Sequence, residues 1–428
     1  MFEIDLKNLQ IKNKIITKKK DFLTVNITSD WSPILQEVSN LMIKKKEKYY
    51  GDLIKYFKGS SLNITNLETV IDTKKRKFEK NAPRYINKPK VLTSLKSINT
   101  HLVCLANNHI IDNGNLGLKK TIHHLKKYKI RHIGADISQR KIYKPFLFKK
   151  NSYKVAIINT SEGEEANEKY NNHIGASDID SFKVIDQIRN YKRKGYLVII
   201  IAHAGVEYIP VPPPYIKKFF KNFVEEGADL VVGHHPHVSQ GFEIYKNTPI
   251  FYSLGNFTMW KKNLRKNCYH SFFLNIEVQS NKLSCINLIP FQIKKNGLNL
   301  IPKKIFYKYI IELNTYLKKS DMIWKAYLNR NNSKVSSFLE HLSFFYNFKK
   351  YKYNQINKHV NLSKKNSDLD FLKDELEISS EYDDILERWQ IKDNSNFLSL
   401  FQNLFYPFYK IYIVIKKIFI FIKKGILK

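Results

Sequence analysis

Short apolar runs alternate with polar, helix-forming stretches over roughly the first 290 residues, and this alternation constrains the fold most strongly. Strands that alternate with helices form layered α/β folds, with the helices on the faces of the sheets. Gly117–Tyr128 and Ile216–Glu226 have amphipathic helical patterns, and Gly227 after the second suits a helix C-cap. The expected strands are Phe22–Ile27, Ser61–Leu67, His101–Ala106, Val155–Asn159, Leu197–Ala202, Leu230–Gly233 and Ile250–Leu254. The sequence therefore predicts an α/β fold.

The composition changes after Lys303. Residues 304–400 are rich in Lys, Asn, Tyr and Phe and contain neither Gly nor Pro, which favours a mostly helical region. We expect three parts: a main domain over residues 1–300, a mostly helical extension over 301–404 and a basic amphipathic helix over 405–428.

The last of these segments combines apolar side chains with lysines at a helical spacing. Lys410, Lys417 and Lys424 are seven residues apart, so they share one face of a helix whose other faces are apolar. Its lysine-free apolar runs are far shorter than the ~20 residues that span a bilayer. The pattern predicts a helix lying on an anionic membrane surface, with docking on this protein or a partner as the alternative.

The N-terminal segment, residues 1–22, has no uninterrupted apolar stretch. We therefore expect neither a secretory signal nor an N-terminal membrane anchor. The expected location is the cytoplasm or, through residues 405–428, the inner face of the cytoplasmic membrane.

The chain carries 73 Lys and Arg against 38 Asp and Glu, a formal net charge of +35. This charge suits attraction to a polyanion such as acidic lipid headgroups, an acidic capsule polymer or nucleic acid. Nucleic acid is disfavoured, because only nine of the basic residues are Arg, the better reader of phosphate and guanine. Lysines that fill solvated positions without a binding role are the alternative explanation.

Polar residues with catalytic potential follow the apolar runs, where the strands should end. They are Asp30, Asn66, Glu68, Asn107, Asn108, His109, His203, His234, His235, His237, Ser253 and Asn256. Because the carboxyl ends of parallel strands share one crevice, these side chains can converge. Pro236 between two histidines restricts that loop and aims both imidazoles the same way.

These residue types limit the chemistry. Asp, Glu, Asn and His supply the oxygen and imidazole ligands that suit Mn²⁺, Fe or Zn²⁺, and one or two ions would polarise a phosphoryl or carbonyl oxygen. The chain has no GxSxG elbow, Walker-type loop or GxGxxG fingerprint that would favour other chemistry. Its three cysteines are widely spaced and form no CxxC pair, which disfavours a disulfide scaffold and a Cys-based zinc site.

Six stretches resemble a known family. They read NLETVI at 66–71, LANNHIIDNGNLGLKKTI at 105–122, HIGAD at 132–136, HAGVEY at 203–208, EGADLVVGHHPHVSQGFEIY at 226–245 and PIFYSLGNF at 249–257. Together they resemble the bacterial capsule-synthesis CapA family, a branch of the calcineurin-like metallophosphatases. The resemblance implies a two-sheet α/β sandwich flanked by helices, with a metal-binding crevice at the strand ends.

The resemblance also implies roles for individual residues. Asp30, Glu68, Asn108, His203, His235 and His237 would hold a divalent metal, with Glu68 as the bridging acid. His109 is similar to the general acid that protonates the leaving group, and Asp112 would orient it. Asn66, Glu207, His234 and Asn256 would contact the substrate, with support of the metal ligands as the alternative for Glu207 and Asn256.

Four positions depart from the family pattern. Ser29 stands for a Gly, Ser32 for a His, Glu68 for an Asp and Ala204 for a Trp. A ligand missing at position 32 would leave one metal site weak, or His234 would take its place.

The leading hypothesis is a metal-dependent hydrolase of phosphoesterase type that acts in capsule, exopolysaccharide or poly-γ-glutamate biosynthesis, on an anionic polymer or a phosphoester. The second is a non-catalytic accessory subunit that binds an anionic polymer or a membrane synthase. Nucleic-acid binding through residues 304–400 is a third, disfavoured reading.

Overall fold

The computed structural model describes residues 2–16, 22–74, 83–163, 166–262, 264, 266–321 and 323. The membrane-surface helix predicted over 405–428 and most of the predicted extension over 301–404 lie outside the described residues. The boundary at residue 300 stays a prediction.

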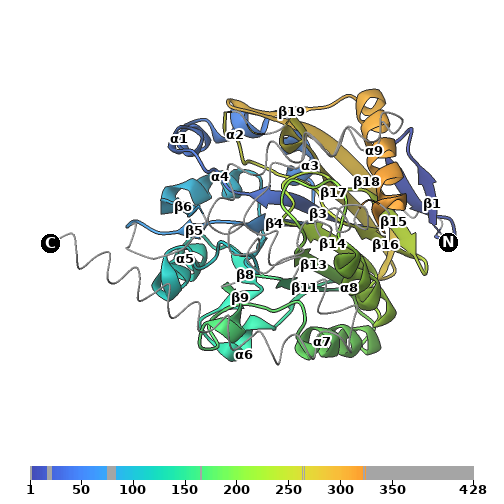
Figure 1. Ribbon diagram of the computed structural model, residues 1–428, viewed down its shortest axis with the longest axis horizontal. Coiled ribbons are helices and arrows are strands. Elements are labelled where there is room, and N and C mark those ends of the chain that lie inside the picture. Colours follow the sequence, from blue (N-terminus) through green and yellow to red (C-terminus); the bar gives the residue numbers. More distant parts are fainter. Residues whose placement is uncertain are drawn as a thin grey trace, which may run out of the picture. The chain divides into compact units, whose positions relative to one another are not determined.

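The larger sheet has nine strands among the described residues (Figure 1). The strands β3, β4, β7 and β8 are parallel, and the others pair antiparallel beside them. In spatial order they are β1 (Phe2–Asp5), β2 (Gln10–Asn13), β18 (Lys282–Lys294), β17 (His270–Gln279), β3 (Leu23–Trp31), β4 (Leu62–Leu67), β7 (Leu102–Cys104) and β8 (Arg131–Ile133), with β19 (Gly297–Leu300) paired to β18.

The second sheet has six strands within the described part of the chain. In spatial order they are β10 (Phe146–Lys150), β11 (Tyr153–Ser161), β13 (Leu197–His203), β14 (Leu230–His234), β16 (Thr248–Phe251) and β15 (Phe242–Tyr245). The four strands from β11 to β16 in this order are parallel. Two small pairs complete the structure: β9 (Ala135–Asp136) with β12 (Gly175–Ala176), and β5 (Val70–Ile71) with β6 (Ile86–Asn87).

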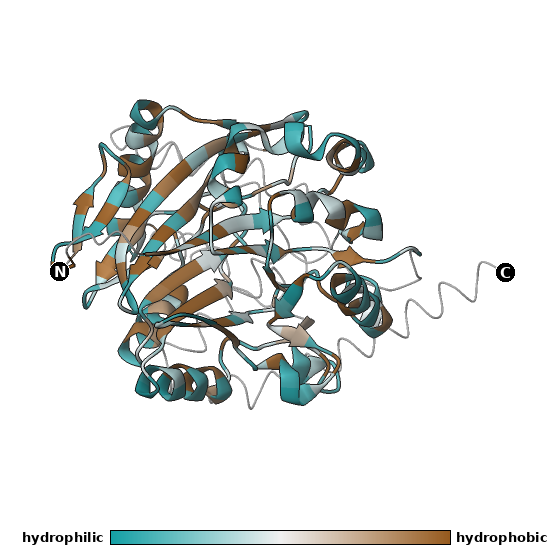
Figure 2. Ribbon diagram, turned by 180° about the vertical axis from the view of Figure 1, so that it is seen from behind, coloured by the Kyte–Doolittle hydropathy of each residue, from teal (hydrophilic) through white to brown (hydrophobic). Residues whose placement is uncertain are grey.

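The two sheets share one hydrophobic core. Ile27 and Ile64 of the larger sheet belong to the same buried cluster as Ile199 and Val232 of the second sheet. Strands buried on both faces need continuous apolar runs, and every residue of β13 is buried. Figure 2 shows these strands as mostly hydrophobic, whereas the surrounding helices carry hydrophilic faces.

Helices cover the outer faces of both sheets (Figure 1). On the second sheet, α7 (Phe182–Arg193) contacts β11 and β13, and α8 (Pro214–Glu225) contacts β14 and β16. On the larger sheet, α5 (Gly114–Lys127) contacts β8, and a second buried cluster joins that sheet to α1 (Gln36–Lys44), α2 (Lys46–Tyr50), α3 (Ile54–Lys58) and α4 (Leu92–Ser97). The predicted two-sheet α/β sandwich flanked by helices is confirmed.

The helix α9 (Lys303–Lys318) packs onto this sandwich. Its Phe306, Ile310 and Leu313 belong to the core that the two sheets share. None of the helices in the described ranges combines the length and the apolar character that crossing a membrane requires.

Candidate metal centre

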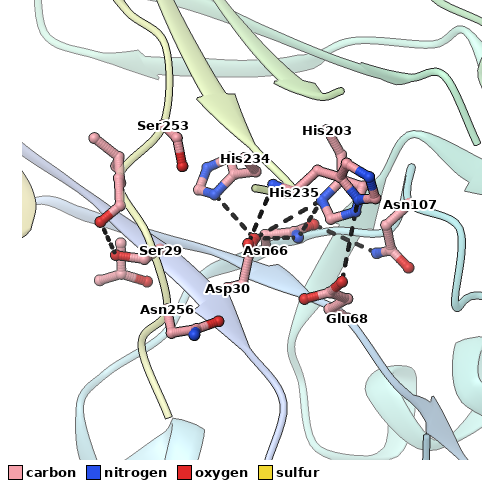
Figure 3. A network of polar contacts seen from close by, with 12 residues as sticks. Ser29, Asp30, Asn66, Glu68, Asn107, His203, His234, His235, Ser253 and Asn256 are labelled. Atoms are coloured by element: carbon pink, nitrogen blue, oxygen red, sulfur yellow. Dashed lines mark hydrogen bonds and ion pairs between the residues drawn. The ribbon is translucent and has the colours of Figure 1, made fainter. Parts of the chain in front are cut away.

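The ends of strands from both sheets meet at the site (Figure 3). Asp30 near the end of β3 is the register partner of Asn66 on β4. His203 ends β13 and is the register partner of His234, which ends β14. Glu68 follows β4 directly, and the loop Asn107–His109 follows β7. Parallel strands therefore bring residues from distant parts of the chain to one edge.

The carboxylate of Asp30 is buried and held from several sides. The side-chain amide of Asn66 donates to Oδ1 over 2.7 Å, and the backbone N–H of His235 donates to Oδ2 over 3.2 Å. The ring atom Nδ1 of His234 lies 3.1 Å from Oδ1. Burial favours the neutral acid, but the imidazoles of His234, His203 and His237 outweigh burial and lower the pKa of Asp30.

Glu68 lies between two imidazoles. Its Oε1 is 3.5 Å from Nε2 of His203 and 3.5 Å from Nε2 of His237. Both carboxylate oxygens are buried, and neither accepts a hydrogen bond from the residues that the structure describes. Burial raises the pKa of Glu68 well above its usual value, aided by the charges of Asp30 and Glu207 and opposed by His237.

The imidazoles of His203 and His235 contact each other. His235 Nδ1 lies 3.0 Å from His203 Nε2, which is also 3.1 Å from Oδ1 of Asn108. Burial and the neighbouring His235 hold the pKa of His203 well below its usual value. The neutral ring this favours is the form that binds a metal.

The loop after β14 has an unusual backbone. His235 and His237 have φ values of 100° and 56°, a region that side-chain-bearing residues rarely adopt. Such strain is typical of functional loops held by their surroundings. Gly233 before this loop lies so close to Tyr252 that an added Cβ would fall 1.9 Å from the Tyr252 carbonyl oxygen.

His237 is fixed on both sides of its ring. Its Nδ1 lies 2.9 Å from Oδ1 of Asn256, whose amide donates back to the His237 carbonyl over 3.0 Å. Its Nε2 lies 3.6 Å from Oε1 of Glu207. Burial opposes protonation, but the charges of Glu68 and Glu207 raise the pKa of His237 to about 9. The contact with His237 in turn overcomes burial and lowers the pKa of Glu207 to about 2.

Two overlapping groups of side chains could hold divalent ions. One comprises Glu68, His203 and His235, and the other Asp30, Glu68 and His237. Within each group the ligand atoms lie within 4.8 Å of one another. Glu68 is common to both groups, and its buried carboxylate accepts no hydrogen bond from a described residue. A bound cation would stabilise this carboxylate. Oxygen and imidazole donors in this combination fit Mn²⁺, Fe or Zn²⁺.

His109 lies beside this cluster, and Asp112 and Tyr85 hold its ring in place. Its Nδ1 is 2.7 Å from Oδ2 of Asp112, which also accepts the backbone N–H of Tyr85 over 2.6 Å. The rings of Tyr85 and His109 stack at 4.2 Å between centroids. The other nitrogen, Nε2, lies 4.0 Å from Oε1 of Glu68. Asn107 shapes the loop by accepting the His109 N–H over 3.1 Å.

One set of contacts joins the twelve residues to which the resemblance gives a role, and Asn107 contacts Asn66 beside them. Ser253, which was also expected at a strand end, instead accepts the backbone N–H of Gly255 over 3.2 Å. Ser32, which stands where the family pattern has a His, is buried, and its Oγ has no hydrogen bond to any described residue. Tyr85 and Tyr208, which are not among the predicted site residues, lie against His109 and His237. Neither aromatic residue stands at the end of an apolar run, so the strand-end pattern could not identify them.

Comparisons with known proteins agree with the motifs. The family model described as "Bacterial capsule synthesis protein PGA_cap" matches residues 18–260, more than half of the chain. The capsule biosynthesis protein CapA of Bacillus anthracis is 28% identical over 250 residues, covering 56% of this chain and 60% of that protein. The PGA biosynthesis protein CapA of Bacillus subtilis is 31% identical over 205 residues, covering 47% and 54%. The chain thus matches just over half the length of these relatives.

Among solved structures, the NAD nucleotidase of Haemophilus influenzae is similar at 14% identity and a TM-score of 0.38, covering 74% of this chain and 61% of that one. The match of the family model over residues 18–260 shows that the chain belongs to the PGA_cap family of bacterial capsule synthesis proteins.

Proposed function

We propose that this protein is a divalent-metal-dependent hydrolase of phosphoesterase type that acts in the biosynthesis of a capsule, an exopolysaccharide or poly-γ-glutamate. The observation that carries the proposal is Glu68, a buried carboxylate without a hydrogen bond from the described residues, set between the imidazoles of His203 and His237. A carboxylate in this environment is stabilised by a cation.

The residues that would hold one or two ions are Asp30, Glu68, Asn108, His203, His235 and His237. When bound, a divalent ion polarises the oxygen of the scissile bond and makes water more acidic. The protein's own part is to hold these ligands in a fixed arrangement at the ends of rigid strands.

In this proposal His109 protonates the leaving oxygen or nitrogen. Its contact with Asp112 through Nδ1 fixes the orientation of the ring, and stacking on Tyr85 restricts it further. The remaining nitrogen, Nε2, faces the cluster at 4.0 Å from Glu68. An imidazole held in this way is suited to general acid catalysis.

The relatives and the charge support the proposed substrate class and partners. The Bacillus relatives are named for capsule and PGA biosynthesis, and a net charge of +35 favours an anionic polymer or phosphoester. A capsule or polymer synthase would be the partner, and residues 405–428 would hold the protein on an anionic membrane surface. Unchanged co-sedimentation with anionic liposomes after deletion of residues 405–428 would remove the membrane contact from the proposal.

Elemental analysis of the purified protein, followed by phosphodiester and phosphomonoester assays, tests the proposal. We expect bound transition metal in the wild type, loss of metal in Asn108→Ala and His235→Ala, and retained metal with turnover reduced about 10²-fold or more in His109→Asn. Wild-type protein without transition metal, or unchanged metal in both ligand variants, would refute the metal site.

A second candidate is a non-catalytic accessory subunit in which the metal is structural. The observation that favours it is the burial of the cluster, because a substrate must reach the ligands of a catalytic metal. The proposed ligand residues are at most 5% exposed, and the neighbouring Glu207 side chain is 17% exposed. Retained metal with no turnover on a panel of phosphoesters and amides would select this candidate.

A further inference from the structure

His234 is a buried imidazole to which the proposed reaction gives no role. It ends β14, and its exposed fraction is 0%. Neither ring nitrogen has a hydrogen bond of regular geometry to any described residue. Burying polar nitrogens without partners is unfavourable, so packing alone does not explain a histidine here.

The polar neighbour of the His234 ring is Asp30. Nδ1 of His234 lies 3.1 Å from Oδ1 of Asp30, the same oxygen that accepts the amide of Asn66 over 2.7 Å. In the view of Figure 3, His234 lies on the side of Asp30 away from Glu68. The His234 imidazole therefore lies on one side of the Asp30 carboxylate, and Glu68 lies on the other side.

His234 does not itself belong to either group of mutually close ligand atoms among the described residues. This geometry favours an indirect role over direct ligation. Partners that hydrogen-bond a ligating carboxylate set its orientation, and losing one typically lowers metal affinity about 10–100-fold.

We propose that His234 is a positioning residue: its Nδ1, which faces Oδ1 of Asp30 at 3.1 Å, holds that carboxylate in place for the ion shared with Glu68 and His237. The inference rests on the proposed function, because it assumes that Asp30 binds a metal. Three strands form this contact: β3 supplies Asp30, β4 supplies Asn66 and β14 supplies the imidazole of His234.

Titration of the metal-free, full-length protein with Mn²⁺ alone tests this role in three variants. In His234→Asn the amide nitrogen can take the place of Nδ1, so affinity should stay within about threefold of the wild type. In His234→Gln the amide lies one bond further out, and His234→Leu has no donor, so both should lose about tenfold or more. Thermal unfolding without metal checks that each variant is folded. If His234→Leu does not fold, His234→Gln alone tests the loss of the contact.

His132→Leu is the matched control. Nε2 of His132 lies 3.4 Å from Oδ2 of Asp136, a similar imidazole–carboxylate contact outside the site, and its loss should leave Mn²⁺ affinity unchanged. Wild-type affinity in His234→Leu or in His234→Gln, or affinity in His234→Asn as low as in His234→Leu, would overturn the inference while leaving the metal site intact. A wild type that does not bind Mn²⁺, Fe²⁺ or Zn²⁺ would instead refute the proposed function, and the inference with it.

Discussion

Several residues of the site have features that lower the stability of a protein core. Glu68 is 0% exposed, and both its oxygens lack a hydrogen bond from the described residues. His235 and His237 hold backbone angles that cost free energy. Such features concentrate where a protein binds or reacts, because the surrounding fold must compensate for them.

Replacing Glu68 by Gln separates binding from stability. Burial raises the pKa of Glu68 and favours its neutral acid, which the neutral amide resembles, so the unfolding free energy of the metal-free protein should not fall. Mn²⁺ affinity should fall at least about tenfold, because a charged ligand is lost. Calorimetric titration and urea unfolding measure the two effects, with Glu37→Gln on α1 as the exposed control. Unchanged affinity would show that Glu68 is not a ligand.

At the scale of elements, one buried amide ties the two sheets together near the site. Asn159 on β11 accepts the backbone N–H of Ala106 over 2.8 Å and donates to the carbonyl of Ile201 on β13 over 2.9 Å. Ala106 directly precedes the loop Asn107–His109. The close approach needs Gly134, where an added Cβ would fall 1.9 Å from Oδ1 of Asn159.

We expect Asn159→Leu to weaken both the fold and the site. The Ala106 N–H loses its side-chain acceptor and the Ile201 carbonyl loses one donor, so the unfolding free energy should fall by about 1–3 kcal/mol. Mn²⁺ affinity should fall too, because Asn108 is no longer held. Urea unfolding and metal titration measure these losses, and Asn222→Leu on the exposed face of α8 should change neither. A variant as stable as the wild type would contradict the link between the sheets.

For the whole molecule, the shared core extends past the predicted boundary at residue 300. The buried side chains Phe306, Ile310 and Leu313 of α9 pack with residues of both sheets. Phe242 on β15 also donates its backbone N–H to the side chain of Asn314 over 2.9 Å. Each fully buried apolar side chain of this size contributes about 1.5–3 kcal/mol.

Two truncated chains locate the boundary. A chain of residues 1–323 keeps α9 and should retain the metal content of the full protein. A chain of residues 1–300 loses α9, exposes part of the shared core and should melt at a lower temperature or aggregate. Thermal unfolding with elemental analysis distinguishes them. Equal melting temperatures would place the end of the domain at 300, as the composition alone predicts.

Only some of the helices and strands have a sequence pattern that identifies them. The parallel strands β13 and β14 and the helices α5 and α8 follow from continuous apolar runs and amphipathic periods. The long hairpin of β17 and β18 was not among the expected strands. Polar residues such as Asn275 and Glu277 alternate with its apolar ones, so no continuous apolar run marks it.

The sequence by itself determined the α/β class and the candidate ligands, because each ligand stands within a short motif at the end of an apolar run. Only the tertiary structure decided how those motifs face one another. The contact of His234 with Asp30, the stacking of Tyr85 on His109 and the bond from Asn159 to Ala106 join residues far apart in the chain. Strand order, register and sheet packing create such contacts, and these depend on interactions summed over the whole core rather than on any local pattern.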